Sequence, residues 1–262
     1  MPTAPVPANG RNPEFIELPR SSAESNVDWL ARASSEVRGS GTYVVLLGGR
    51  RAAALRLRVA QSHVRHDMTP SHWHHAVLLQ SDGQLDDASR GWHVPMEPDM
   101  PLGFPPGTNG VQEVRLDAFQ DATTYPNIAL LSIPVDLARI HTAVATFAKH
   151  RTAMDLSELL AAWLAYSWGV GRSENPLAAG LGIPAGVMIE AVMAAAGIEL
   201  SPNMPTRGTC PEIFWQAATW WHKYYESRRA LRISADDPGA GSSSQSTALS
   251  GRHIVADRLV PV

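Results

Sequence analysis

The chain has 262 residues, which is long enough for one large domain or two small ones. Its formal net charge of −3 gives no reason to expect nucleic acid or an anionic membrane surface as the main partner. Its apolar runs are too short to span a membrane, and its single cysteine, Cys210, excludes an internal disulfide and suits a reducing compartment.

The two ends differ in composition from the middle. Residues 1–25 are rich in Pro, Asn and Ser and predict an irregular arm without a signal peptide, so we expect a cytoplasmic location, with secretion by a dedicated system left open. Residues 233–262 are dense in Gly and Ser and predict a flexible tail, although its last part, HIVADRLVPV, is apolar enough to dock. Either end could contact a protein partner. The segment between them, 26–232, is expected to form one domain.

Strand patterns follow one short expected helix at 26–37 and continue to residue 133. Apolar runs separated by Gly-containing turns predict these strands at 42–47, 53–59, 74–80, 84–88, 111–119 and 127–133. From Pro134 onward the apolar period becomes helical, and the expected helices are 134–151, 155–169, 183–197 and 210–229. Strands first and helices afterwards predict an α+β fold, in which an antiparallel sheet from the N-terminal half packs against helices from the C-terminal half.

Cys210 lies at the expected start of the last helix. Pro211 and Glu212 follow it, and both residue types favour the first turn of a helix. Unpaired backbone N–H groups at a helix start favour the thiolate, so Cys210 is a candidate nucleophile. Gly208 and Thr209 are candidates to border an oxyanion pocket, because a glycine lets the backbone approach a substrate carbonyl. The alternative is a small buried apolar residue, which a free cysteine often is.

Histidines crowd the start of an expected hairpin, at His63, His66, His72, His74 and His75. A catalytic interpretation needs one of them to face the thiol and a polar group to orient its second ring nitrogen. A three-residue turn at SDG would put Val77 opposite Asp87. His75 and Asp87 would then share one face of the hairpin. A two-residue turn would select Asp86 instead, and a one-residue slip would select His74 as the base.

A metal site is the competing interpretation of the same cluster. His72 and His74 alternate at strand spacing and could point to one face. Asp67, Asp86 and Asp87 could complete the set of ligands. However, no second Cys or His cluster and no helical His-Glu-x-x-His pattern accompanies them, so we expect no metal and no other cofactor.

Two motifs resemble those of a known superfamily. HAVLLQSDGQLDDAS resembles the histidine hairpin of NlpC/P60-type, papain-like cysteine hydrolases, and TCPEIF is similar to their nucleophile motif, with Pro211 in place of a small hydroxyl residue. The order, histidine before cysteine, resembles that of the circularly permuted branch. The likeness extends from about Thr42 to Tyr225.

The resemblance matches His75 to the family's base, Cys210 to its nucleophile and Asp87 to the third position. Other members more often carry His, Glu or Gln at that third position, so Asp87 is a departure. The resemblance therefore implies a papain-like catalytic domain over 26–232. In this arrangement Trp73 could flank the cleft or pack in the core, and we expect His93 at the cleft rim or in solvent.

The activity that the resemblance implies is that of a cysteine-dependent hydrolase, an amidase or peptidase, which forms an acyl-enzyme at Cys210 with His75 as base. Backbone N–H groups near Cys210 would hold the oxyanion. The substrate would be a peptide, an isopeptide or an acyl compound. An acyltransferase or deacylase acting on lipid or thioester substrates could use the same pair. A His-rich metal-binding protein and a catalytically inactive papain-like module that binds a partner are the alternatives from other classes.

Overall fold

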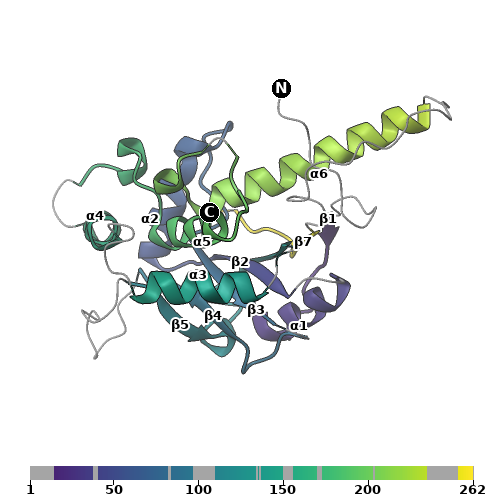
Figure 1. Ribbon diagram of the computed structural model, residues 1–262, viewed down its shortest axis with the longest axis horizontal. Coiled ribbons are helices and arrows are strands. Elements are labelled where there is room, and N and C mark those ends of the chain that lie inside the picture. The colour runs from purple at the N-terminus through teal and green to yellow at the C-terminus, as the bar shows by residue number, and fades with distance from the viewer. Residues whose placement is uncertain are drawn as a thin grey trace.

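A mixed seven-stranded sheet, with helices packed on both of its faces, organises the part of the chain that the structure describes (Figure 1). In this computed structural model the described residues are 15–37, 41–81, 84–96, 110–133, 135, 137–149, 156–169, 173–202, 204–234 and 253–261. Within these ranges the fold is α+β with six α-helices, in agreement with the predicted fold class.

The sheet has the strand order β1-β7-β6-β2-β3-β4-β5. Its strands are β1 (Phe15–Glu17), β2 (Thr42–Gly48), β3 (His75–Gln80), β4 (Arg90–His93), β5 (Gln112–Arg115), β6 (Asn127–Ile133) and β7 (His253–Ala256). The α-helices are α1 (Asn26–Glu36), α2 (Ala52–Ala60), α3 (Leu137–Lys149), α4 (Leu156–Trp168), α5 (Pro184–Ala195) and α6 (Pro211–Ser234). Short 3-10 helices are η1 (Gln61–Val64), η2 (Leu116–Phe119), η3 (Pro176–Ala179) and η4 (Thr206–Gly208). The β1–β7 pair is parallel and the other pairs are antiparallel.

The sheet divides the hydrophobic core into two halves. Successive side chains of a strand point to opposite faces, and β3 shows this alternation. Val77 and Leu79 pack in the core half that contains α1. Ala76 and Leu78 pack in the larger half, which contains residues of α2 to α6. Figure 1 shows α1 on the lower side of the sheet and α2 and α5 on the upper side. Neighbouring residues of β3 therefore serve different halves of the core.

Most expected elements are present, but two predicted strands are wrong. The segment 53–59 lies in helix α2, because Ala, Leu and Arg are strong helix formers and outweigh the short alternating pattern. The segment 84–88 contains no strand. There the Ser89 hydroxyl donates to the Asp86 carboxylate at 2.7 Å, which closes a turn before β4.

Both ends that we expected to lack structure contribute a strand to the sheet. β1 lies within the predicted irregular arm, so that prediction is wrong at 15–17, whereas β7 lies in HIVADRLVPV, the part of the predicted tail that is apolar enough to dock. Ile254 and Val255 are buried where β7 fills the gap between β1 and β6, and this burial stabilises the pairing. An ion pair of 2.9 Å between Arg20 and Asp257 lies beside it. The rest of the arm, 1–14, and the tail segment 235–252 lie outside the described residues.

Helix α6 extends well beyond the sheet (Figure 1). Its first turns are buried at Ile213, Phe214 and Ala218, whereas Trp220 is largely exposed. The helix begins at Pro211, so Cys210 occupies the preceding, capping position, as predicted. Within the described residues, no helix combines the length and the apolar character needed to cross a membrane.

Candidate functional site

His75 is the first residue of β3, a strand that pairs with β2 on one side and β4 on the other. Strand alternation places its side chain on the face of Val77, toward the core half of α1. There its ring centroid lies 6.0 Å from that of Phe119. Only 6% of the residue is exposed, so the sheet and this aromatic neighbour fix the imidazole in one place.

His93, the last residue of β4, is the hydrogen-bond partner of His75. Nε2 of His75 and Nδ1 of His93 are 2.9 Å apart, and the shared proton can belong to either ring. Leu78 pairs with Trp92, so the next step of the same register puts Val77 opposite His93. His75 and His93 are therefore diagonal neighbours on one face of the sheet.

The predicted hairpin register is wrong. The return strand begins at Arg90 and not within 84–88, so Val77 does not pair with Asp87. Asp86 and Asp87 are exposed in the connection that precedes β4. The structure therefore brings neither aspartate to His75, and it places His93, which we expected at the rim or in solvent, where Asp87 was predicted.

His74 lies next to this pair and is held by the backbone of β2. Its Nδ1 lies 2.8 Å from the Leu47 carbonyl oxygen and 3.0 Å from the Gly49 backbone nitrogen. A protonated Nδ1 donates to Leu47, and a bare one accepts from Gly49, so each tautomer satisfies one contact. The ring also stacks on Tyr125 at a centroid distance of 6.0 Å. Its remaining nitrogen, Nε2, is left for other contacts.

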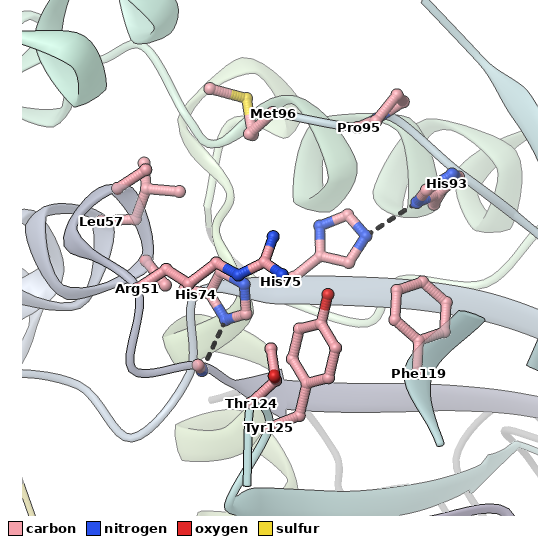
Figure 2. A pocket seen from close by; sticks show the side chains of 13 residues that line it. Arg51, Leu57, His74, His75, His93, Pro95, Met96, Phe119, Thr124 and Tyr125 are labelled. Carbon is pink, nitrogen blue, oxygen red and sulfur yellow. Dashed lines mark hydrogen bonds between the residues drawn. The ribbon is translucent and has the colours of Figure 1, made fainter. Parts of the chain in front are cut away.

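These three histidines line one cavity, which we call the three-histidine pocket (Figure 2). Its volume is about 110 Å³. The other lining residues are Gly49, Arg51, Ala53, Ala54, Leu57, Pro95, Met96, Phe119, Thr124 and Tyr125. The pocket thus combines imidazoles, one guanidinium and two aromatic rings with an apolar wall, and its lining contains no carboxylate and no thiol.

The pocket histidines are neutral at pH 7. Burial lowers the pKa of His74 and of His93 to about 4. Burial, followed by the nearby His93 and His74 rings, holds the pKa of His75 well below its usual range. A neutral imidazole offers one donor and one acceptor, so the group can bind a polar ligand without an added positive charge.

Cys210 lies in the other half of the core. It packs in the cluster of Ala76 and Leu78, on the sheet face opposite to that of His75, and it is fully buried. Burial raises the pKa of its thiol to about 12, although the backbone N–H groups of Ile213 and Glu212 act in the opposite direction. Within the described residues no hydrogen bond joins its sulfur to an imidazole.

Close backbone packing seals the Cys210 segment against the start of α5. A Cβ on Gly182 would come to 2.2 Å from the Thr209 carbonyl oxygen, and one on Gly186 to 2.9 Å from the Cys210 Cα. Thr209 is fully buried, and Gly208 donates its N–H to the Pro205 carbonyl oxygen at 2.8 Å. Of the predicted oxyanion-pocket residues, Thr209 is therefore packed against protein and Gly208 is partly exposed, and neither lines the three-histidine pocket.

Trp73 and Glu212 also belong to the interior on the side of Cys210. The Trp73 ring is fully buried, 5.1 Å from the Trp215 ring. Glu212 is 1% exposed and accepts a 2.7 Å hydrogen bond from the Ser71 hydroxyl and a 3.1 Å ion pair from Arg65. These contacts anchor the start of α6.

The metal interpretation rested on histidines and aspartates of the same region. Within the described residues, no three or more His, Cys, Asp or Glu side chains gather closely enough to hold a metal ion. Asp67 instead forms a salt bridge of 2.8 Å with Arg65, and this hydrogen-bonded contact lowers the carboxyl pKa.

His93 is the site residue that sequence reasoning missed. The resemblance itself offered a signal, because a histidine is common at the third position of the family. A short turn at SDG places the aspartates at 86 and 87, and not the segment RGWHV with His93, at the matching distance from His75. A longer connection would have selected His93. Arg51 was also missed, because its segment was expected to precede a strand and not a helix.

Comparison of the chain with known proteins gives no match to a protein family, to a curated protein or to a solved structure.

Proposed function

We propose that this chain is a papain-like module that binds a small polar ligand in the three-histidine pocket, and that Cys210 is a core residue and not its nucleophile. The observation that carries the proposal is that the fully buried thiol of Cys210 does not line the pocket that the three imidazoles line. Cys210 packs with Ala76 and Leu78, whereas His75 points to the opposite face and lines a cavity. A ligand can therefore reach the histidines without meeting the sulfur.

Two features support the papain-like part of the proposal. A histidine opens a central strand of the sheet, and a polar side chain on the return strand bonds its ring. That partner is His93, one of the residue types that the resemblance implies at the third position. The order of His75 before the capping Cys210 is the order of the permuted branch.

The cysteine hydrolase and the acyltransferase remain hypotheses that need a different arrangement of Cys210. Thiolate chemistry requires the sulfur to reach a substrate carbonyl and an imidazole within hydrogen-bonding distance. The buried thiol with a pKa of about 12 meets neither condition. The start of α6 would have to leave Gly182 and Gly186 before Cys210 could serve as a nucleophile.

Thiol labelling tests the assignment of Cys210. Because Cys210 is the single cysteine, one measurement reports on it alone. The thiolate fraction falls about tenfold for each pH unit by which the pKa rises. We therefore expect iodoacetamide at pH 7.5 to label the native chain roughly a thousandfold more slowly than the chain in denaturant. Fast native labelling that is lost in His75→Ala would refute the proposal in favour of the hydrolase.

A matched pair of substitutions tests the pocket. Ala53 lines it, whereas Ala52, its exposed neighbour in α2, does not. Ala53→Phe should fill the cavity and Ala52→Phe should leave it open. Ligand-observed NMR with small neutral, cationic and anionic fragments should give hits with the wild type and Ala52→Phe that disappear with Ala53→Phe. Fragment binding that survives Ala53→Phe, or no binding of any class to the wild type, would contradict the proposed function.

A further inference from the structure

The first turn of α2 forms one side of the three-histidine pocket. Gly49, Arg51, Ala53 and Ala54 all line the cavity, and α2 begins at Ala52. Arg51 is the capping residue, and no side chain accepts a hydrogen bond from the first N–H groups of this helix. A helix N-terminus carries a partial positive charge and attracts anions. By itself this is a general property of helices, so a second, independent observation is needed.

His75 supplies that observation. It is more than nine-tenths buried, it lines the pocket, and its Nε2 is used by His93. Its other ring nitrogen, Nδ1, has no hydrogen-bond partner in the part of the chain that the structure describes. Figure 2 shows this nitrogen on the side of the ring that faces away from His93. A buried polar atom without a protein partner costs free energy unless a ligand or water satisfies it.

The surrounding charges also favour an anion. Arg51 lines the pocket, and Figure 2 shows its side chain directed into the group of histidines. Arg58, about two turns further along α2, is 1% exposed and donates only to the carbonyl oxygens of Ser71, Gly49 and Val260. Its charge has no carboxylate partner among the described residues, so it adds an unbalanced positive field beside Gly49.

The size and the apolar wall restrict the ligand further. A volume of about 110 Å³ is slightly below that of a cavity that holds one benzene ring, about 150 Å³. Ala53, Ala54, Leu57, Pro95 and Met96 give one side of the pocket an apolar lining suited to a short hydrocarbon group. The polar side, with Arg51 and the imidazoles, suits the two oxygens of a carboxylate.

We infer that the three-histidine pocket binds a small carboxylate with a short apolar substituent, and that the carboxylate selects the tautomer of the His75–His93 pair in which His75 carries its hydrogen on Nδ1. This inference rests on the proposed function, since it names the ligand class of the same pocket. Arg51 and the start of α2 contact the carboxylate, and His75 donates to it through Nδ1–H.

The hydrogen bond between the two rings allows this contact. When His75 Nε2–H donates to His93, Nδ1 of His75 is bare and would repel a carboxylate oxygen. When His93 Nδ1–H donates to His75 Nε2, His75 carries its hydrogen on Nδ1 and can donate it to the ligand. A carboxylate therefore selects the second neutral tautomer, and binding needs no proton from solvent.

Other charged and titratable groups lie at this pocket. His74 directly precedes β3, Arg51 caps the start of α2, and Tyr125 lies in the segment before β6. The Asp121 carboxylate accepts a hydrogen bond from the Thr124 hydroxyl, and Thr124 lines the pocket. Arg51 is therefore the one cation in the lining formed by the described residues.

The test uses butyrate and its uncharged analogue butyramide, titrated into the full chain by calorimetry between pH 6 and 8. We expect butyrate to bind at least about tenfold more tightly than butyramide, in keeping with charge-assisted hydrogen bonds. Its affinity should change little over this pH range, because the pair stays neutral. The heat measured in two buffers of different ionisation enthalpy should therefore show no proton uptake.

Matched variants separate the contributions. Arg51→Gln should weaken butyrate about tenfold, whereas Arg50→Gln, which changes the adjacent cation outside the lining, should change it less than about twofold. Ring nitrogen shifts by NMR should show hydrogen on Nδ1 of His75 when butyrate is added to the wild type. The same change should appear in His66→Gln, which replaces an exposed histidine.

Three results would overturn the inference. They are butyramide binding as tightly as butyrate, butyrate binding that leaves Nδ1 of His75 without hydrogen, and equal affinity in Arg51→Gln and Arg50→Gln. If neutral fragments still bind the wild type and are lost in Ala53→Phe, the proposed function stands and only the carboxylate assignment fails. If no fragment binds at all, both fail together.

Discussion

Cys210 and the three-histidine pocket both contain residue types that sequence patterns mark as reactive, and both are buried, but their surroundings differ. At Cys210, backbone packs on backbone through Gly182 and Gly186, and no space remains at the sulfur. At the histidines, side chains meet around an open cavity. The capping position favours a thiolate only while solvent can reach it, and here burial outweighs the helix start. Reactivity therefore depends on access more than on position in an element.

Acid should destabilise the pocket side most strongly. The unfolded chain protonates its imidazoles near pH 6.5, whereas His74 and His93 in the fold do so only near 4. The unfolded state thus binds more protons in this range, and stability present above pH 6.5 is lost as the pH falls toward 4. We expect a loss of up to about 1.4 kcal/mol per pH unit for each histidine, measured by urea unfolding at several pH values.

The control for acid destabilisation is a pair of histidine variants. His93→Gln should lower the pH slope by about one proton, while His66→Gln, which is exposed, should keep the slope of the wild type. If the free energy of unfolding of the wild type does not change between pH 6.5 and 4.5, the pocket histidines have the same pKa in the folded and the unfolded chain. Their burial would then not perturb them as the burial of Cys210 perturbs its thiol.

Loss of the Glu212 anchor should open the Cys210 side. Glu212→Ala removes a buried carboxylate that holds Arg65 and Ser71, and we expect about 3–5 kcal/mol lower stability. Glu158→Ala, which breaks an exposed ion pair with Arg207, should cost about 0–1 kcal/mol. Labelling of Cys210 in native conditions should become faster only in Glu212→Ala. Equal labelling rates in the two variants would mean that this network does not seal the thiol.

A methyl group placed against the Cys210 segment should have a smaller effect. Gly182→Ala puts a Cβ at 2.2 Å from a backbone oxygen, which forces α5 and η4 apart, and we expect a loss of about 1–3 kcal/mol. At Gly208 the nearest atom would be 3.7 Å away, so Gly208→Ala should be close to neutral. Thermal unfolding of both variants checks the pair. If Gly182→Ala does not change the stability, the backbone around Cys210 can move apart at little cost in free energy.

The sequence predicts correctly those helices and strands whose signals, a capping residue or a continuous apolar run, lie within the element itself. Helix α1 has a capping box at Ser25 and Asp28, and β2 and β6 are continuous apolar runs, so their signals were unambiguous. The strand predicted at 53–59 failed because alternation over a short window competes with helix propensity. The pairing of β1 with β7 joins segments far apart in the chain, and no local pattern contains that information.

The candidate site shows the same limit. The crowd of histidines and the capping position of Cys210 could be found from residue order alone, and His75 does lie at the start of a strand. Which residue meets which could not be found, because a longer hairpin connection replaced Asp87 by His93. The burial of Cys210 depends on how η4 approaches α5, a contact between separate segments that only the folded chain reveals.

The place of β7 in the sheet has a consequence for synthesis on the ribosome. β1 is made early, yet it touches the sheet through Ile254 and its neighbours, which follow far later in the chain. Phe15–Glu17 must therefore wait, unpaired, until β7 has been translated. A chaperone that shields Phe15 and Ile16 on the nascent chain would protect the protein during this interval, when it is most prone to aggregate.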